Sequence, residues 1–111
     1  IKPAGHPIPI DGPVGELVKA TNRHHYRPAH LHFLFFKEGY KTLISQIYVN
    51  DDPVLDTDVQ FGVTKALIGN YIRHDGSETP PAADVKGEWY TLDQTFVMEP
   101  GEARLPRAPI Q

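Results

Sequence analysis

The sequence of 111 residues contains no cysteine. This absence excludes disulfide bonds, thiolate metal ligands and a cysteine nucleophile. It also favours a reducing compartment, because disulfides are rare there and common in secreted proteins. We therefore expect a cytoplasmic protein.

The chain also has no excess of positive charge and no long apolar run. Eleven Lys and Arg residues face fourteen Asp and Glu residues, and the formal net charge is −3. The basic residues are scattered, so the sequence offers no basic stripe for nucleic acid. Nothing approaches the roughly 20 apolar residues that span a bilayer. We expect neither a nucleic-acid partner nor a membrane partner.

Strand patterns dominate what is present. Residues 29–36 and 42–49 are rich in aromatic and branched side chains, and the turn residues 37–40 separate them. This arrangement predicts an antiparallel hairpin. Residues 89–98 alternate well enough to predict a last strand.

Two other segments stay ambiguous between helix and strand, namely residues 16–21 and 63–72, and residues 74–87 form a polar connection. The sum predicts a mostly β chain, a sandwich or barrel, forming one domain over residues 1–111. Four strands are too few for a closed sandwich. We therefore expect a missing segment or a partner to supply the rest.

The most informative motif is Arg27-Pro28-Ala29-His30-Leu31-His32-Phe33. Residues two apart on a strand point to the same face, so His30 and His32 project side by side. Two imidazoles aimed at one point favour a metal site. The alternative is that they are ordinary half-buried histidines, which is the commoner explanation for an isolated pair.

The motif resembles the signature of the intradiol ring-cleavage dioxygenases, which include catechol and hydroxyquinol 1,2-dioxygenases. The similarity extends over roughly residues 3–75. It includes Pro7-Ile8-Pro9-Ile10-Asp11-Gly12-Pro13-Val14-Gly15, Gly39-Tyr40, Gln46-Ile47-Tyr48 and Asp52-Pro53-Val54-Leu55-Asp56.

The resemblance implies an antiparallel β-sandwich of the intradiol dioxygenase type and a small phenolic substrate. It also implies a non-haem ferric iron, Fe3+, held by two tyrosines and two histidines. His30 and His32 match the two histidines. Arg27 and Gln46 match residues that the family places near the bound aromatic ring, and we name them as candidate catalytic residues.

The tyrosine ligands do not carry over. One of them corresponds by position to His6, and the other belongs to an N-terminal part of the family fold that this sequence lacks. Three imidazoles, from His6, His30 and His32, suit zinc or ferrous iron better than ferric iron, and a site without metal is a further alternative. His6 can also act as a base toward a phenol, so it is a candidate for either role.

Three functions remain open. The first is an intradiol-type dioxygenase with an altered metal site. The second is a redox-neutral cyclase or isomerase that uses the same histidines and arginine on a phenolic or polyketide-like substrate. The third is a non-catalytic binding or assembly subunit, which has no need of Arg27 and Gln46 beside both histidines. For each of them we expect a homo-oligomer, or a complex with the missing N-terminal segment.

Other polar residues have less specific explanations. We expect His24 and His25 to be structural and His74 to be solvated. Four aspartates lack the spacing of a calcium loop and are expected to form turns and caps; they are Asp51, Asp52, Asp56 and Asp58. Five tyrosines are alternative phenolate donors, although packing explains each of them better; they are Tyr26, Tyr40, Tyr48, Tyr71 and Tyr90.

Overall fold

The computed structural model describes residues 2–106, and its regular secondary structure is mainly short strands, so the mostly β prediction is confirmed. The elements are β1 (His6–Pro7), α1 (Pro13–Ala20), β2 (Tyr26–Arg27), β3 (His30–Phe35), β4 (Leu43–Val49), β5 (Ile68–Gly69), β6 (Ile72–His74) and β7 (Trp89–Thr91), with 3₁₀ turns at Leu55–Thr57 and Lys65–Leu67. They form three small sheets, in the orders β1-β2, β3-β4-β5 and β6-β7.

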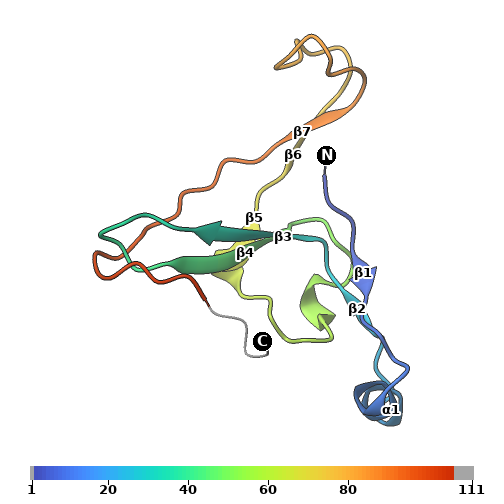
Figure 1. Ribbon diagram of the computed structural model, residues 1–111. Coiled ribbons are helices and arrows are strands. Elements are labelled where there is room, and N and C mark those ends of the chain that lie inside the picture. Colours follow the sequence, from blue (N-terminus) through green and yellow to red (C-terminus); the bar gives the residue numbers. More distant parts are fainter. Residues whose placement is uncertain (1, 107–111) are drawn as a thin grey trace.

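The antiparallel hairpin β3–β4 forms as predicted and lies at the centre of the molecule (Figure 1). Gly39 permits the turn because its φ of +84° is a conformation that side-chain-bearing residues rarely adopt. The register places His30 opposite Tyr48 and His32 opposite Gln46. Both histidines therefore share one face of the sheet with these two β4 residues.

The opposite face of the hairpin is aromatic. Phe33 and Phe35 stack with ring centroids 5.7 Å apart, and Phe96 packs on them at 4.9 and 4.6 Å. Since side chains alternate along a strand, the polar and aromatic residues of β3 separate onto two faces. The aromatic contacts hold the irregular segment around Phe96 against the sheet.

A short ladder that the sequence pattern did not predict joins the N-terminal loop to the segment before β3. Strand β1 pairs antiparallel with β2, so that His6 lies opposite Arg27. The amide of Ile8 also donates to the carbonyl of His25 at 2.8 Å. Two-residue strands in a proline-rich loop carry no periodicity, which explains why they were not predicted.

The ambiguous segment after the N-terminal loop is helix α1. Pro13 occupies the first turn, where its missing N–H costs nothing, and Glu16 pairs with Lys19 at 3.0 Å. At Gly15 an added Cβ would lie 2.0 Å from the carbonyl oxygen of Ile10. Glycine is therefore required where the helix crosses the preceding loop.

The C-terminal part differs from the prediction in two places. Residues 63–72 form neither one helix nor one strand, since a 3₁₀ turn leads into β5 and then β6. The predicted strand 89–98 ends at Thr91, and the following residues run irregularly to a bridge between Tyr40 and Pro100. Strand β5 joins β4 in parallel, so the central sheet is mixed.

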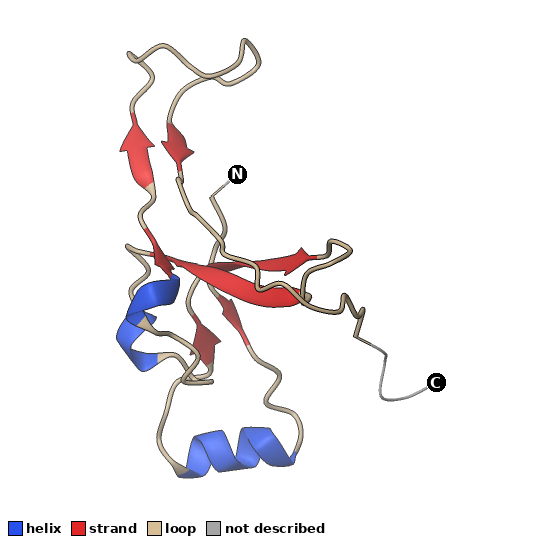
Figure 2. Cartoon of the chain, turned by 90° about the vertical axis from the view of Figure 1, so that its left-hand side faces the viewer, coloured by secondary structure: helices blue, strands red, loops and turns tan. Residues whose placement is uncertain are grey.

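The molecule is open, with α1 and the β6–β7 hairpin extending from the central sheet in opposite directions (Figures 1 and 2). Its radius of gyration is 17.8 Å, whereas a compact domain of this length would have about 13 Å. The buried apolar core is small and consists of Val18, Ala29, Ile47, Tyr48, Val49 and Val59. Among the described helices, none has the length and apolar character needed to cross a membrane.

Apolar side chains also remain exposed on the histidine face of the hairpin, where Leu34 is 51% and Ile44 is 60% exposed. Strand β3 pairs with β4 on one side only and forms an edge of the described sheet. An apolar face beside an unpaired strand favours association. We predict that sedimentation at micromolar concentration shows a species heavier than one chain.

A substitution on this face tests the same prediction. We expect Leu34→Glu to shift sedimentation toward the monomer, because a charge cannot be buried unpaired in the contact. Leu17→Glu is the matched control, since Leu17 is 65% exposed on α1, away from the hairpin. A cooperatively melting monomer of the unaltered chain would contradict the prediction.

Candidate functional site

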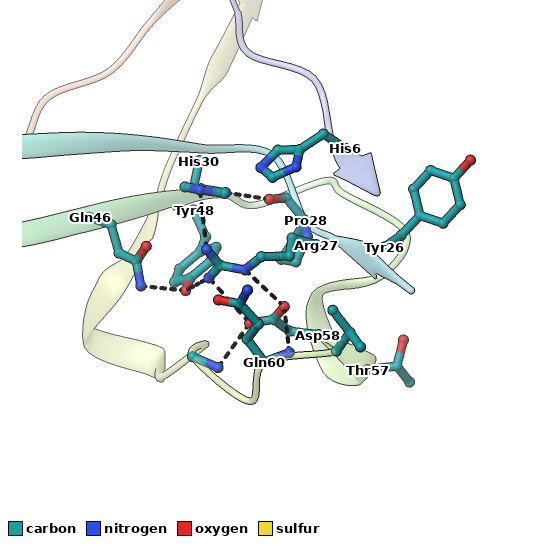
Figure 3. Close-up of polar contacts among 12 residues, drawn as sticks. His6, Tyr26, Arg27, Pro28, His30, Gln46, Tyr48, Thr57, Asp58 and Gln60 are labelled. Atoms are coloured by element: carbon teal, nitrogen blue, oxygen red, sulfur yellow. Dashed lines mark hydrogen bonds and ion pairs between the residues drawn. The ribbon is translucent and has the colours of Figure 1, made fainter. Parts of the chain in front are cut away.

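His30 is the central residue of the candidate site (Figure 3). It begins β3 and is half-buried, with its Nδ1 2.7 Å from the carbonyl oxygen of Pro28. Its Nε2 lies 3.4 Å from Nη1 of Arg27, which can only donate. The two contacts favour a neutral imidazole that donates from Nδ1 and accepts from Arg27 at Nε2, so a metal at Nε2 would replace the contact with Arg27.

Burial lowers the pKa of His30, and the nearby Arg27 guanidinium and the rings of His32 and His6 lower it further. The hydrogen bond to the Pro28 carbonyl opposes this shift without cancelling it. The ring therefore favours its neutral form at physiological pH.

The other two candidate histidines flank His30. The ring centroid of His32 lies 4.8 Å from that of His30, and the centroid of His6 lies 5.3 Å from it. Imidazole nitrogens bind zinc at about 2 Å, so two rings on one ion have centroids roughly 5 Å apart. Each pair has the spacing of neighbouring ligands, and β1–β2 pairing is what brings His6 to this position.

The three rings nevertheless do not converge on one point. Within residues 2–106, no group of three or more His, Asp or Glu side chains is placed to hold a metal ion. His6 and His32 are both exposed and flank His30 without meeting at a common centre. The described residues therefore supply a pair of adjacent imidazoles, with a third beside them.

A tyrosinate ligand is also not supplied by the tyrosine nearest the histidines. The Tyr48 ring lies 5.6 Å from that of His30, but burial raises the pKa of its hydroxyl, which favours the neutral phenol. Tyr26 is exposed and points away from the site (Figure 3). The donor set thus does not fit the ferric site with two tyrosines that the resemblance implies.

Arg27 lies in the core of the described residues. It is 7% exposed, and its Nε donates to Oδ1 of Asp58 at 3.3 Å. Its Nη2 donates to the hydroxyl of Tyr48 at 2.8 Å. Only Nη1 remains directed toward His30.

Asp58 is the buried counterion of Arg27, with 3% exposure. Burial by itself raises the pKa of this carboxyl, but hydrogen bonds from the Gly62 amide, the Arg27 guanidinium and the Gln60 amide outweigh it. The pKa of Asp58 therefore lies below its usual range. The carboxylate is held ionised by donors from both the backbone and Arg27.

Gln46 joins the same network, since its Nε2 donates to the Tyr48 hydroxyl at 2.6 Å. It also lines a pocket of about 300 Å³ with His32, Ile44, Ser45 and Leu67. The candidate residues Arg27, Gln46, His30 and His32 therefore belong to one connected site, with His6 at its rim.

Sequence reasoning missed the role of Asp58, which was expected only to form a turn. It does accept backbone amides, and Asp52 likewise accepts from Ala29 and Val54. However, 31 residues separate Asp58 from Arg27, and no local pattern signals that contact. Tyr48 carried a signal, because its spacing from Gln46 placed both on one face.

The remaining histidines lie outside the site. His24 bonds to Thr57 at 2.7 Å and accepts from the Tyr26 amide, in agreement with a structural role. The expectation that His74 is solvated is wrong. Its ring is half-buried and stacks on Trp89 at 3.9 Å, and it bonds to Glu78 and Thr91.

Comparisons with known proteins find matches over most of the chain. A family model described as Dioxygenase matches residues 1–93. A 6-chlorohydroxyquinol 1,2-dioxygenase from Cupriavidus pinatubonensis is 46% identical over 96 residues, covering 86% of this chain and 30% of that protein. A hydroxyquinol 1,2-dioxygenase from a Rhizobium species is 41% identical over 98 residues, covering 87% of this chain and 33% of that protein.

Solved structures of dioxygenases also resemble this chain. The hydroxyquinol 1,2-dioxygenase of Pseudomonas putida superposes with a TM-score of 0.76 at 40% identity, over 89% of this chain and 35% of the other. The catechol 1,2-dioxygenase of Pseudomonas arvilla superposes with a TM-score of 0.82 at 29% identity, over 99% of this chain and 38% of the other. These neighbours confirm the predicted β-sandwich class. The chain spans about a third of the length of the curated relatives it matches.

The Arg27–Asp58 pair generates a prediction about stability and pH. Because the pKa of Asp58 is lower in the folded than in the unfolded chain, the stabilisation is present above the ordinary aspartate pKa of about 4 and is lost as pH falls through the folded value. We expect Asp58→Asn to lower the free energy of unfolding at pH 7 by about 3 kcal/mol, since it leaves Arg27 buried without its counterion.

Urea unfolding between pH 3 and pH 7 measures this effect. The difference between Asp58→Asn and the unaltered protein should shrink as the pH falls below the range where Asp58 is ionised. Asp51→Asn is the control, because Asp51 pairs with Lys2 at the surface and should have little effect. Equal effects of the two substitutions would show that the Arg27–Asp58 pair is not a main source of stability.

The paired histidines generate a second prediction. If the protein binds a transition metal, His30→Ala and His32→Ala should each lower the metal content, measured by elemental analysis of the purified protein. His25→Ala is the control, since its ring contacts only Tyr26 among the described aromatic rings. Unchanged stoichiometry in both site variants would exclude these histidines as ligands.

Proposed function

The chain belongs to the intradiol ring-cleavage dioxygenase family, and from this premise we propose that it is part of an enzyme that opens a catechol-type aromatic ring. Hydroxyquinol is the substrate class we favour, because both relatives described above are named for hydroxyquinol or its chlorinated form. The reaction breaks the bond between the two hydroxylated ring carbons. Each of these carbons becomes a carboxylate that contains one atom of the dioxygen.

The observation that carries this proposal is the grouping of four side chains, three on one face of the central sheet and the fourth, Arg27, on the neighbouring strand β2. His30 and His32 lie side by side on β3, Gln46 lies opposite His32, and Arg27 points Nη1 at His30. A purely structural protein has no need of this combination. An aromatic diol placed beside the two imidazoles would have a cationic donor within reach.

In this reaction Arg27 would stabilise negative charge on a substrate oxygen. Its guanidinium remains protonated at any physiological pH, and its burial strengthens the interaction with a phenolate. Asp58 and Tyr48 occupy Nε and Nη2, and Nη1 lies 3.4 Å from Nε2 of His30, so only the second proton of Nη1 is left to meet the ligand. The exposed ring of His6 is placed to take up a proton as the phenol ionises.

We propose that the metal site is altered from that of the family. His6 stands where the family has a ligand tyrosine, and the described residues fit a nitrogen-rich site better than a tyrosinate site. Such a set suits a divalent ion such as ferrous iron, because imidazole is a neutral donor that does not favour the ferric state as phenolate does. His30 and His32 would hold the ion, while His6 lies beside them and would have to move to reach it.

A second candidate is a redox-neutral cyclisation or isomerisation of a phenolic substrate. The His6 position favours it, since a general base replaces an iron ligand while Arg27 remains available to stabilise an enolate. Zinc or no metal at all would be compatible with this chemistry. Oxygen consumption separates the two candidates directly.

We also propose that the active form contains more polypeptide than this chain. The open shape, the small core and the exposed Leu34 and Ile44 support a partner, either a second copy or further chain of the same protein. That partner would cover the apolar part of the histidine face and enclose the substrate.

The function is tested with an oxygen electrode and an absorbance assay of the product, using the iron-loaded protein with hydroxyquinol and with catechol. We predict that the protein is nearly colourless, because the visible band of the family arises from tyrosinate bound to ferric iron. His6→Tyr should introduce that band and raise the stability of bound ferric iron.

The control for colour is His25→Tyr, which adds a tyrosine beyond the three imidazoles and should add no visible band. A strong band in the unaltered protein would overturn the altered site, since another tyrosine must then reach the iron. Tight binding of phenolic compounds without oxygen uptake would favour the redox-neutral candidate instead.

A further inference from the structure

A second cavity lies beside the β6–β7 hairpin, which extends from the central sheet (Figures 1 and 2). Its volume is about 520 Å³, and it shares no lining residue with the pocket beside Gln46. Three aromatic side chains line it, since Tyr71 precedes β6 and the neighbours Trp89 and Tyr90 belong to β7. Concave sites of this size with aromatic walls and a few polar groups are typical of small-molecule binding.

Two of these aromatic residues carry a polar atom without a partner. Within residues 2–106, the buried side-chain polar atoms that form no hydrogen bond are the Tyr71 hydroxyl and Nε1 of Trp89. The indole N–H can only donate. Burial raises the pKa of the Tyr71 hydroxyl, so the phenol keeps its proton and can also donate. A buried donor without an acceptor costs stability, and both of them lie beside the same cavity.

Lys2 brings positive charge to this cavity. Its Nζ lies 4.6 Å from the centroid of the Tyr90 ring and pairs with Asp51, which leaves further N–H groups of the ammonium to donate. The lining carboxylate of Glu88 is already engaged, because it accepts from the Tyr90 hydroxyl and from Arg73. The cavity therefore has a cationic donor beside an acid that other groups neutralise.

The other charged residues of the lining are Asp84 and Lys86, whose charges offset each other. His74 stacks on the indole of Trp89 at 3.9 Å but does not line the cavity, so the cavity adjoins a different part of the indole. The groups left for a ligand are mainly donors, namely a phenol, an indole N–H and an ammonium, and they lie among aromatic rings.

We propose that this cavity is a second binding site, which takes a small aromatic carboxylate. The carboxylate accepts from the Tyr71 hydroxyl, from Nε1 of Trp89 and from the Lys2 ammonium, and the ring of the ligand packs against the aromatic wall. A carboxylate is favoured over a neutral acceptor because charge-assisted hydrogen bonds are stronger. The inference does not depend on the proposed ring cleavage, and its test involves no oxygen uptake.

Benzoate is the probe, and Trp89 is the reporter because it is the only tryptophan in the sequence. We expect benzoate to change the Trp89 fluorescence saturably, with the same affinity by calorimetry. Benzyl alcohol keeps the ring but lacks the carboxylate, and it should bind about tenfold more weakly. The absence of saturable benzoate binding by both methods would overturn the proposal.

Tyr71→Phe removes one of the three donors and keeps the ring. We expect the affinity for benzoate to fall about tenfold. The stability of the ligand-free protein should not fall, because the hydroxyl has no partner among the described residues to lose. This combination separates ligand binding from packing. Tyr40→Phe is the matched control, since Tyr40 lies between β3 and β4 and does not line the cavity.

Lys2→Met covers the case in which Tyr71→Phe does not fold. It keeps an apolar side chain over the Tyr90 ring and removes the charge, so a similar loss of benzoate affinity is expected. Lys37→Met is the matched control, because Lys37 lies over Tyr40 at 5.2 Å, outside the cavity. Benzoate affinity that is unchanged in both site variants would show that benzoate binds elsewhere, and the proposal would fail.

Discussion

The structure depends above all on the buried contact between Arg27 and Asp58. Both side chains are withdrawn from water, so the pair persists only because each charge has several partners. Asp58 receives the amides of Gln60 and Gly62, and Arg27 also reaches Tyr48. The pair ties the loop after β4 to β2 and so brings the guanidinium beside His30. The stability of the fold and the geometry of the site therefore depend on the same two charges. A substitution that changes either charge affects both properties.

The residues of the candidate site are held in place in two different ways. Arg27 and Gln46 are oriented by buried groups of the chain itself, through Asp58 and Tyr48. The histidines are oriented by strand β3 and by the carbonyl of Pro28. His6, in contrast, sits on an exposed two-residue strand. A substitution at its position changes the donor set without disturbing the network behind it.

The open shape has a direct physical cause. The hairpin β3–β4 covers its aromatic face with Phe96 but leaves Leu34 and Ile44 uncovered on the face that carries the histidines. A sheet with two apolar faces needs a layer on each side, and the described residues supply one. The uncovered apolar stretch continues from the candidate site. Covering it would bury apolar area and exclude water from the imidazoles at the same time.

The sequence by itself determined the hairpin, the shared face of His30 and His32, and the placement of Gln46 and Tyr48 on one strand face. These features follow from the period of two along a strand, which is visible in the residue order. The family was also predicted from the motif and its spacing. The tertiary structure alone decided that Arg27 is buried, that Asp58 is its counterion, and that β1 brings His6 beside His30. These contacts join residues far apart in the chain through loops and two-residue strands, where no periodic pattern records which partner each side chain will meet.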